Sequence, residues 1–405
     1  MSEATVTVLS GAGVVLPDRV ASDLSLVLEG SRIVELRRGL QPVGDREQHV
    51  DVSGCVIAPG FVDVHIHGAA GVDVLDSAAA PGEVARALPR WGVTAFCPTA
   101  TAAEPHVLDR FLVAVGELRG NPQAGAARVL PAHLESSFIS PEYRGAQPLA
   151  HLRLPSASAT EGAHPGGLGF SAREVVSVID RHRADVGIVT LAPELDGALD
   201  LVRAFSAAGV RVSMGHSGAT FAEAQAAVAA GATHATHLFN RMRPMSHREP
   251  GVAGAVLASE AVAAEVIGDG VHVHAAFVRL VVAAKGVDRV MAITDATAGA
   301  GLPAGSRVRL GGQPIVVSDV ARLEDGTMAG SVATMDRVFS WLVTACGLDL
   351  SQAAVLCSTT PARQLGLVGL GTLTPGSIAD FVVLDRNLAV VSTWIGGRAS
   401  FPQVR

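Results

Sequence analysis

The sequence predicts an α/β protein, a (β/α)8 TIM-like barrel with a small β-sandwich domain built from both termini. Both ends of the chain are rich in short strands, whereas the middle alternates strand and helix. The middle contains eight candidate strands, each apolar enough to be covered on both faces, as in a parallel barrel. Histidines and carboxylates gather where these strands end, which is the face of a barrel that carries active sites.

Length and composition agree with a large folded protein. The chain has 405 residues, of which 49% are hydrophobic and 17% charged, so global disorder is excluded. The net charge of −7 argues against general nucleic-acid binding, although a local basic pocket for an anionic ligand stays possible. The 4 cysteines show no CxxC spacing and predict neither a zinc knuckle nor a disulfide framework.

Nothing in the sequence indicates export or membrane insertion. The first residues contain neither a basic segment nor a long apolar segment of the signal-peptide kind. No uncharged apolar run approaches the roughly 18 residues that a membrane helix needs. We therefore expect a cytoplasmic protein that binds neither membrane nor nucleic acid.

The two termini are expected to form one sandwich. Residues rich in β-formers and bounded by turns predict strands at 6–15, 24–28, 32–36, 380–384 and 390–395. The simplest arrangement assigns residues 1–58 and 369–405 to the sandwich and residues 59–368 to the barrel.

The barrel strands are expected at residues 60–67, 94–99, 128–135, 187–194, 211–217, 234–240, 264–272 and 289–296. Three helices between them end before a glycine, the residue that commonly terminates a helix. They are 83–91 before Gly92, 199–208 before Gly209 and 221–230 before Gly231. A doubly wound open sheet is the alternative fold, but it gives no reason for the polar residues at the strand ends.

Two connections are long enough to act as lids or binding loops at a barrel rim. Residues 140–171 are rich in Pro, Gly, Ser and Ala. Residues 297–331 contain a predicted hairpin of 307–310 against 314–317.

Side chains typical of a metal site stand at the ends of the predicted strands. They are His65, His67, His133, Glu135, His216, His237, Asp269, His272 and Asp295. His65 and His67 are two residues apart on a strand, so both point to one face and can share a metal ion. Taken alone, such a pair is more often two ordinary histidines than two ligands.

The surrounding residues make the pair more specific. The run APGFVDVHIHG (58–68) resembles the first-strand signature of the amidohydrolase superfamily. The resemblance extends over nearly the whole chain and, in this order of motifs, points to the N-acetylglucosamine-6-phosphate deacetylase family. The motifs are HLE (133–135), LAPE (191–194), GHSGAT (215–220), THLFN (236–240), REPG (248–251), DGVH (269–272), TDA (294–296), AGS (329–331) and the closing PGSIADFVVLD.

The resemblance implies a metal site and a catalytic residue. Glu135, His216 and His237 match the ligands of the family's principal metal, and His65 and His67 match those of a second metal that only some members bind. One or two divalent ions are therefore implied, with zinc favoured and iron, manganese or cobalt as alternatives. Asp295 matches the acid/base that takes a proton from the attacking water and returns it to the departing amine.

The resemblance also implies a phosphorylated amino sugar as substrate and a homodimer whose partner subunit completes the phosphate site. Asn240, Arg248 and His272 match positions that contact sugar and phosphate. Arg248 could instead cap a turn, and His272 could be an ordinary rim histidine. The loop that closes over the substrate is matched by Met328, Ala329 and Gly330.

Three departures from the family pattern concern the substrate pocket. Ser136-Ser137 replace a usual Gly-Pro, and Gln147, after Ala146, stands where the family often has histidine. Arg241 follows Asn240 where a small residue is usual, so it would either crowd the sugar or add a phosphate contact. The single lysine, Lys285, ends a predicted helix, so we expect Glu135 rather than a carboxylated lysine to bridge two ions.

The function that the resemblance implies is deacetylation of N-acetylglucosamine 6-phosphate to glucosamine 6-phosphate and acetate, in amino-sugar catabolism. The departures keep other substrates open, such as N-acetylgalactosamine 6-phosphate or an N-acyl amino acid. A non-catalytic assembly protein on the same scaffold is disfavoured, because such a protein should have lost ligands.

Overall fold

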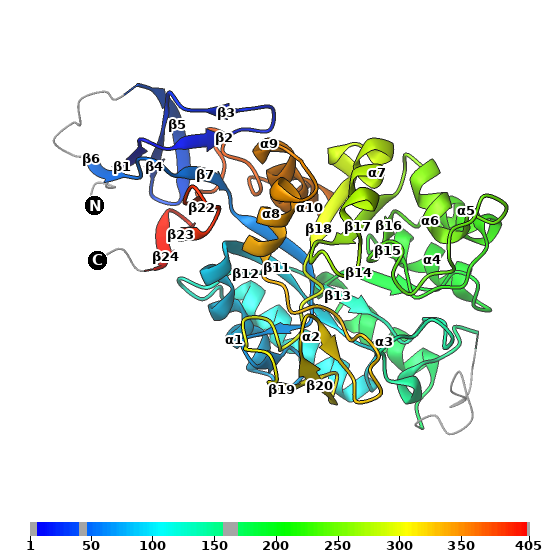
Figure 1. The fold of residues 1–405 in the computed structure, drawn as a ribbon. Coiled ribbons are helices and arrows are strands. Elements are labelled where there is room, and N and C mark those ends of the chain that lie inside the picture. Colours follow the sequence, from blue (N-terminus) through cyan, green and yellow to red (C-terminus); the bar gives the residue numbers. More distant parts are fainter. Residues whose placement is uncertain (1–5, 40–46, 157–168, 403–405) are drawn as a thin grey trace.

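The computed structural model shows a barrel with a β-rich unit to one side, formed by both termini (Figure 1). The structure describes residues 6–39, 47–156 and 169–402. Among these residues, no helix combines the length and the apolar character needed to cross a bilayer.

Eight parallel strands form the barrel in chain order, which confirms the predicted fold class. The ring closes between its last and first strands, where the Asp295 amide donates to the His65 carbonyl (3.0 Å) and the His67 amide to the Ala296 carbonyl (2.8 Å). Nearly every strand residue is buried, as expected for a sheet covered on both faces. The strands are β8 (Phe61–Ile66), β11 (Val93–Ala100), β13 (Ala132–Glu135), β14 (Val186–Leu191), β15 (Arg211–Met214), β16 (His234–Ala235), β17 (Ala263–Ile267) and β18 (Val290–Ile293).

Helices surround the strands (Figure 1). The predicted glycine stops are confirmed, since Gly92, Gly209 and Gly231 have φ of 79°, 80° and 120°. The segment predicted at 83–91 begins earlier and ends in a 3-10 turn at Leu88–Trp91. The helices are α1 (Ala80–Ala87), α2 (Pro105–Gly120), α3 (Ala172–Arg181), α4 (Ala198–Ala207), α5 (Phe221–Ala230), α6 (Gly251–Ala258), α7 (Ala275–Lys285), α8 (Met335–Thr344), α9 (Leu350–Ala354) and α10 (Thr360–Gln364).

Strands from both termini pack into two sheets, as predicted. Their shared apolar core includes Leu26, Ile33, Phe381 and Trp394. The first sheet has the order β5 (Arg32–Arg38), β4 (Leu24–Glu29), β1 (Val6–Ser10), β6 (Glu47–Asp51). The second has the order β24 (Arg398–Phe401), β23 (Val390–Ile395), β22 (Phe381–Leu384), β7 (Val56–Pro59), β2 (Gly13–Val15), β3 (Val20–Ala21). The exact domain boundaries at 58/59 and 368/369 stay predictions.

Two strands predicted as continuous are broken. The strand predicted at 6–15 is divided between the two sheets, because Gly11 turns the chain with φ of 86° and a side chain there would collide with Ser53. The strand predicted at 128–135 is interrupted at Pro131, which lacks the amide hydrogen that a sheet ladder uses. Only β12 (Arg128–Val129) and β13 remain of it.

The predicted strands also run too far at their carboxyl ends. Those predicted at 211–217, 234–240 and 289–296 stop at Met214, Ala235 and Ile293. Beyond these points the chain leaves the sheet through residues with left-handed backbone, namely His216 (φ 49°), His237 (φ 31°) and Asp295 (φ 50°). Left-handed conformations are uncommon for residues other than glycine and cluster at functional sites.

The two long connections lie at the rim. The predicted hairpin is present as β19 (Arg307–Leu310) and β20 (Gln313–Val317), to which β21 (Ala321–Arg322) adds a third strand. Residues 157–168 of the other connection lie outside the described residues. A short hairpin after the first barrel strand, β9 (Gly68–Ala69) with β10 (Val72–Asp73), completes the rim.

Candidate metal centre and active site

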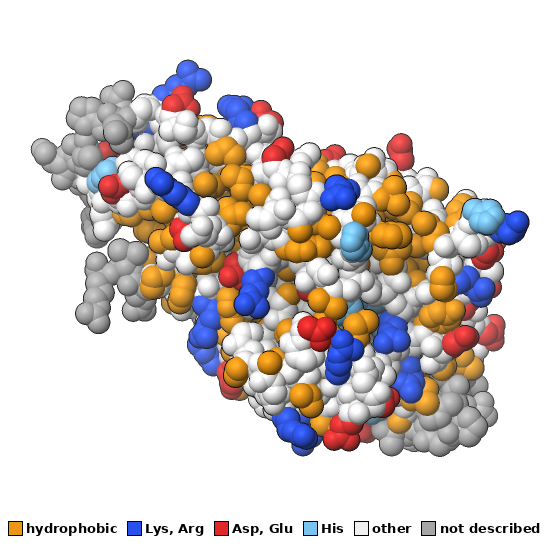
Figure 2. All heavy atoms as spheres, viewed as in Figure 1, with side chains coloured by type: hydrophobic (Ala, Val, Ile, Leu, Met, Phe, Trp, Pro, Cys, Tyr) orange, Lys and Arg blue, Asp and Glu red, His pale blue; other side chains and the backbone are white. Residues whose placement is uncertain are grey.

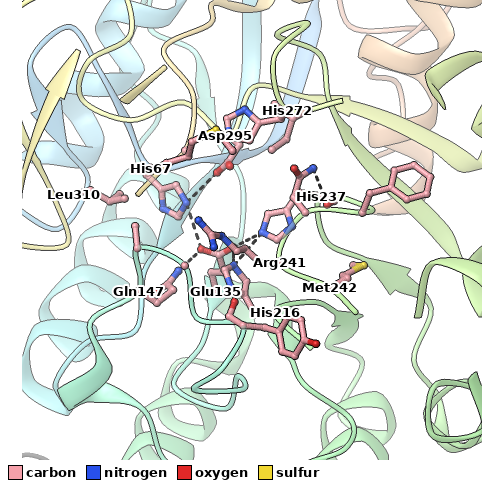
Figure 3. A pocket seen from close by; sticks show the side chains of 18 of the residues that line it. His67, Glu135, Gln147, His216, His237, Arg241, Met242, His272, Asp295 and Leu310 are labelled. Atoms are coloured by element: carbon pink, nitrogen blue, oxygen red, sulfur yellow. Dashed lines mark hydrogen bonds and ion pairs between the residues drawn. The ribbon is translucent and has the colours of Figure 1, made fainter. Parts of the chain in front are cut away.

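A pocket of about 590 Å³ lies at the carboxyl-terminal end of the barrel (Figure 3). Four predicted metal ligands and the predicted catalytic residue line it, namely His67, Glu135, His216, His237 and Asp295. The predicted substrate residues in its lining are Ala146, Gln147, Asn240, Arg241, His272, Met328 and Gly330. The fifth predicted ligand, His65, is fully buried, and Ala329 and Arg248 are also absent from the lining.

The first ligand group joins the ends of three barrel strands. Glu135 Oε1 lies 2.8 Å from His216 Nε2 and 2.9 Å from His237 Nε2, and the two imidazole nitrogens are 3.0 Å apart. Zinc binds such atoms at about 2.0–2.2 Å, which would separate the ligands of a tetrahedral site by about 3.3 Å. His216 Nδ1 donates to the Tyr143 carbonyl at 2.8 Å, which leaves Nε2 free to bind metal. The group therefore fits a divalent ion.

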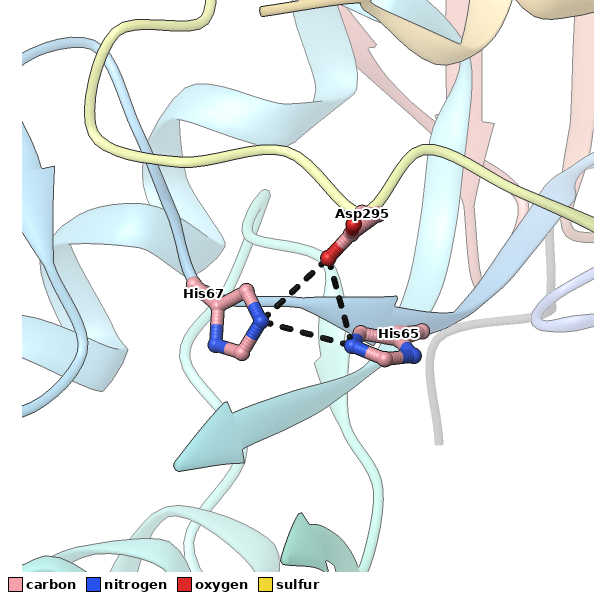
Figure 4. A group of neighbouring side chains, drawn as sticks. All are labelled: His65, His67 and Asp295. Carbon is pink, nitrogen blue, oxygen red and sulfur yellow. Dashed lines mark hydrogen bonds and ion pairs between the residues drawn. The ribbon is translucent and has the colours of Figure 1, made fainter. Parts of the chain in front are cut away.

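The second group consists of His65, His67 and Asp295 (Figure 4). The two histidine Nε2 atoms and Asp295 Oδ1 are each 3.3 Å from the other two. His67 Nδ1 donates to the Thr99 carbonyl at 3.0 Å, so its Nε2 also faces the group. This arrangement provides a second set of ligand atoms beside the first.

Glu135 lies between the two groups. Its Oε1 contacts the first group, while its Oε2 is 3.5 Å from His67 Nε2. Its carboxylate lies where it would contact an ion in either group, and the bridging of two ions stays a prediction. Lys285 takes no part, because its Nζ donates to the carbonyls of Val256 and Ser259.

The charges of the site call for a cation. Burial alone would raise the pKa of Glu135, but His216 and His237 outweigh burial and hold it well below its ordinary value. Burial opposes ionisation of Asp295 in the same way, and its neighbours His65 and His67 lower its pKa nonetheless. Burial would also lower the pKa of His67, but Asp295 and Glu135 raise it to about 9. A proton on His67 offsets one of the two buried negative charges, and a divalent metal ion in its place would offset both.

Backbone strain is concentrated here. Seven described residues other than glycine have positive φ, and five of them line the pocket. They are His216, His237, Phe239, Arg241 and Asp295. Each such residue costs on the order of 1–3 kcal/mol, so the surrounding structure must hold the site firmly.

Several predicted substrate residues already have partners within the protein. Gln147 Nε2 donates to Glu135, and its Oε1 accepts from the Ala102 amide at 2.8 Å. His272 Nδ1 donates to Asp269 Oδ2 at 2.6 Å, which leaves its Nε2 for the pocket. Ser136 turns away from the pocket and donates to the Thr190 carbonyl at 2.5 Å.

Two arginines predicted near the substrate lie in different places. Arg241 lines the pocket and packs over Gly145, where an added Cβ would come within 2.7 Å of Arg241 Nε. Among the described residues it is the one lysine or arginine in the lining, and Figure 3 shows it projecting across the ligand cluster. Arg248 is exposed on the loop before α6. Met328 and Gly330 border the pocket, while Ala329 is buried with its amide bonded to Ala321 O.

Some residues of the site were not predicted from the sequence. Tyr143, the only tyrosine of the chain, and Phe239 line the pocket without any spacing that marks them. Glu265 is fully buried beneath the ligands and contacts His65. A glutamate within the apolar run of β17 is an anomaly that could have identified it.

Known proteins resemble this chain over most of its length. The amidohydrolase family model matches residues 56–399. The N-acetylglucosamine-6-phosphate deacetylase of Bos taurus is 39% identical over 365 residues, which cover 87% of this chain and 85% of the relative. The Homo sapiens enzyme of that name is 37% identical over 94% of this chain and 88% of its own length. The N-acetylgalactosamine-6-phosphate deacetylase of Escherichia coli O157:H7 is 34% identical over 85% and 88%.

Solved structures of enzymes with the same name resemble this chain over nearly its whole length. N-acetylglucosamine-6-phosphate deacetylase from Pasteurella multocida superposes with a TM-score of 0.87 at 26% identity, covering 97% of this chain and 98% of that one. A mutant of the Mycobacterium smegmatis enzyme, in complex with N-acetyl-D-glucosamine-6-phosphate, gives 0.85 at 32% identity, covering 98% and 100%.

The barrel and its paired histidine–carboxylate groups define a hydrolase that acts with a divalent metal. The chain belongs to the amidohydrolase family, and within it to the N-acetylglucosamine-6-phosphate deacetylases, as its motifs predicted.

Proposed function

We propose that the chain hydrolyses the acetamide of N-acetyl-D-glucosamine 6-phosphate to D-glucosamine 6-phosphate and acetate, in the amino-sugar catabolism of the cytoplasm. One observation carries the proposal. A single pocket joins buried metal-ligand groups, bridged by Glu135, to the exposed guanidinium of Arg241. An amide at one end of a small substrate and an anionic group at the other match these two features.

Glu135, His216 and His237 would hold one divalent ion, and His65 and His67, with Glu135, a second. Imidazole and carboxylate donors favour zinc, with iron, manganese and cobalt as alternatives. When bound, such an ion lowers the pKa of a water and polarises an amide carbonyl.

Asp295 is the proposed acid/base. Its carboxylate is ionised near neutral pH because its pKa is lowered, so it can accept the proton of the attacking water. It then delivers that proton to the amine nitrogen, which leaves poorly unless protonated. The backbone hydrogen bond from its amide to His65 O fixes the position from which both transfers occur.

The substrate's anionic end is assigned to Arg241 and to His272, whose Nε2 is free for the pocket. A guanidinium and an imidazole both suit a phosphate dianion. Asn240, held by the carbonyls of His237 and Leu238, and the Met328–Gly330 segment would contact the sugar.

A homodimer is part of the proposal. Arg248 is exposed outside the pocket of its own chain, so a phosphate contact by Arg248 fits a neighbouring subunit. Large hydrophobic side chains are exposed nearby, including Met245 (41%) on the same loop and Phe277 (45%) and Leu280 (48%) on α7. Figure 2 shows hydrophobic side chains gathered where α7 lies in Figure 1. Phe277 packs edge-on against Phe239 of the pocket, with ring centroids 5.2 Å apart.

N-acetylgalactosamine 6-phosphate is the second candidate substrate. It is favoured by the galactosamine-specific relative at 34% identity and by Gln147 and Arg241, which depart from the family pattern. An N-acyl amino acid remains a third. A non-catalytic role is disfavoured because both ligand groups and Asp295 are intact.

The test is acetate release by metal-reconstituted protein supplied with N-acetylglucosamine, its 6-phosphate and the galacto 6-phosphate. Strong preference for the gluco 6-phosphate would support the proposal. Preference for the galacto epimer would replace the substrate, and no turnover of any of them by metal-loaded protein would reject it. Asp295→Asn is the inactive control.

A further inference from the structure

We infer that Glu265 is a positioning residue that sets which nitrogen of His65 faces the metal and anchors the backbone at His237. It would thereby support both ligand groups from beneath. The inference rests on the proposed function only in taking the two groups as metal sites.

Glu265 lies in β17 with no exposed surface. Its Oε2 lies 3.0 Å from His65 Nδ1 and accepts from the His237 amide at 3.3 Å. Its backbone carbonyl accepts from the Leu238 amide at 2.8 Å. One residue therefore contacts a member of each ligand group.

The contact with His65 determines where the ring proton resides. A neutral imidazole carries a proton on one of its two nitrogens, and His65 Nδ1 lies 3.0 Å from Glu265 Oε2. When Nδ1 donates that proton to Glu265, Nε2 presents a lone pair toward His67 and Asp295. The other tautomer would place a hydrogen among the ligand atoms and set a lone pair against the carboxylate. A carboxylate behind a metal-binding histidine commonly has this orienting effect.

The contact with His237 acts on the backbone. His237 has φ of 31°, a strained value for a residue other than glycine. Its amide, just past the end of β16, finds its acceptor in the Glu265 carboxylate. This hydrogen bond holds the chain at the point where it must turn to bring Nε2 to Glu135.

Glu265, His65 and His133 could themselves be taken as a third metal group, because their ligand atoms lie close together. The contacts of His133 argue against this interpretation. Its Nδ1 donates to the Val64 carbonyl at 3.1 Å, and its Nε2 pairs with Thr190 Oγ1 at 2.7 Å. Both ring nitrogens of His133 therefore have hydrogen-bond partners within the protein. We take Glu265, His65 and His133 as a group that supports the ligands from beneath and not as a third metal site.

Burying the carboxylate of Glu265 costs free energy, which indicates that this residue has a role beyond filling space in the core. Its Oε1 is buried and lacks a hydrogen-bond partner among the described residues. A buried carboxylate with an unpaired oxygen is expensive, and an apolar side chain would suit the rest of β17. The two hydrogen bonds to ligand residues supply the reason for a glutamate.

The test compares Glu265→Ala and Glu265→Gln with wild type, using metal-stripped protein. Nitrogen-15 NMR of the histidine rings reports the tautomer, with the His65 signals assigned by their loss in His65→Asn. We expect the Nδ1–H form of His65 in wild type and in Glu265→Gln, whose amide oxygen can still accept. Loss of that preference is expected in Glu265→Ala.

Zinc titration by calorimetry provides the second readout. Glu265→Ala should bind zinc about 10- to 100-fold more weakly, the usual cost of removing such a partner, and Glu265→Gln should lose less. Lys285→Met is the matched control, since it removes another buried charge that contacts no ligand and should leave zinc affinity unchanged.

An unchanged His65 tautomer and unchanged zinc affinity in Glu265→Ala would overturn the inference. If Glu265→Ala does not fold, the same two measurements on Glu265→Leu, which fills more of the same space, decide the question. Failure of the proposed function would appear separately, as absence of acetate release by wild-type protein that binds zinc normally.

Discussion

The Nε2 atoms of His65 and His67 face each other 3.3 Å apart, and both lie 3.3 Å from Asp295 Oδ1. Two neutral imidazoles whose lone pairs converge would repel, so either a proton on His67 or a metal ion is needed between them. The geometry follows from the two-residue spacing on β8, which directs both side chains to the same face of the strand. Asp295 approaches from β18, the strand that closes the barrel against β8.

The position of Asp295 leads to a prediction about catalysis. Asp295→Asn keeps an oxygen beside His65 and His67 but removes the group that accepts and returns a proton. Turnover should fall at least about 10²- to 10⁴-fold, the usual contribution of a general acid/base. Acetate release and metal content of the same preparation would check this. Substantial residual turnover at full metal occupancy would remove Asp295 from proton transfer.

His67 should make the protein's behaviour depend on pH. Its pKa is raised from 6.5 to about 9 in the folded protein, so the folded state without metal holds its proton more tightly than the unfolded chain. That stabilisation is fully present below about pH 6.5 and is lost as pH rises through about 9. The melting temperature of metal-stripped protein should decline over this range, and His67→Asn should show a smaller decline.

The same proton should couple metal binding to pH. A metal ion needs the neutral imidazole of His67, so binding below about pH 9 must release its proton, and affinity should rise with pH. Calorimetry of zinc binding at about pH 7.5 in two buffers of different ionisation enthalpy would count the protons released. A count that is the same for wild type and His67→Asn would contradict the assignment.

Much of the site could be predicted because its residues follow the two-residue repeat of a β-strand and stand where the strands end. The pair His65 and His67 and the closing residue Glu135 stand where apolar strands end, which locates them on the rim without knowledge of the structure. The strand ends themselves were placed too late at His216 and His237. Their left-handed backbone leaves no mark in a sequence where the residue is not glycine.

Contacts between distant segments were beyond prediction. Glu265 meets His65 across 200 positions of sequence, and only the closed barrel brings them together. The separation of Arg241 from Arg248 was also hidden, because Arg241 follows THLFN and Arg248 begins REPG in the same connection. Which of two arginines on one loop faces the pocket depends on the loop's path, and Arg241 faces it with φ of 50° over Gly145.

Arg241 should determine affinity for the phosphate. Arg241→Ala is expected to raise KM for the phosphorylated sugar about 10- to 100-fold, the range for losing a hydrogen bond to a charged group, while kcat changes little. The unphosphorylated sugar should be affected less. Arg243→Ala is the matched control, since Arg243 is exposed and donates to the Gly218 carbonyl outside the pocket. A lower KM in Arg241→Ala would instead mean that Arg241 crowds the sugar.

Arg248 provides a test of the dimer. Alone, Arg248→Ala should raise KM for the phosphorylated sugar, and Asp295→Asn should be inactive. If Arg248 acts across the interface, a hybrid dimer of the two variants contains one site with both Asp295 and an intact Arg248 from the other chain. Mixing the variants under conditions of subunit exchange should therefore restore activity at low substrate concentration.

Random subunit exchange predicts a definite fraction of restored sites. Random exchange of equal amounts of two variants places half of all dimers in the hybrid form, and each hybrid carries one complete site of two. About a quarter of the wild-type activity per subunit is therefore expected at low substrate concentration, since hybrids follow binomial association. If Arg248 served its own chain, no hybrid site would combine it with Asp295, and mixing would give only the sum of the separate activities. A monomeric protein in sedimentation analysis, with KM unchanged in Arg248→Ala, would exclude both arrangements.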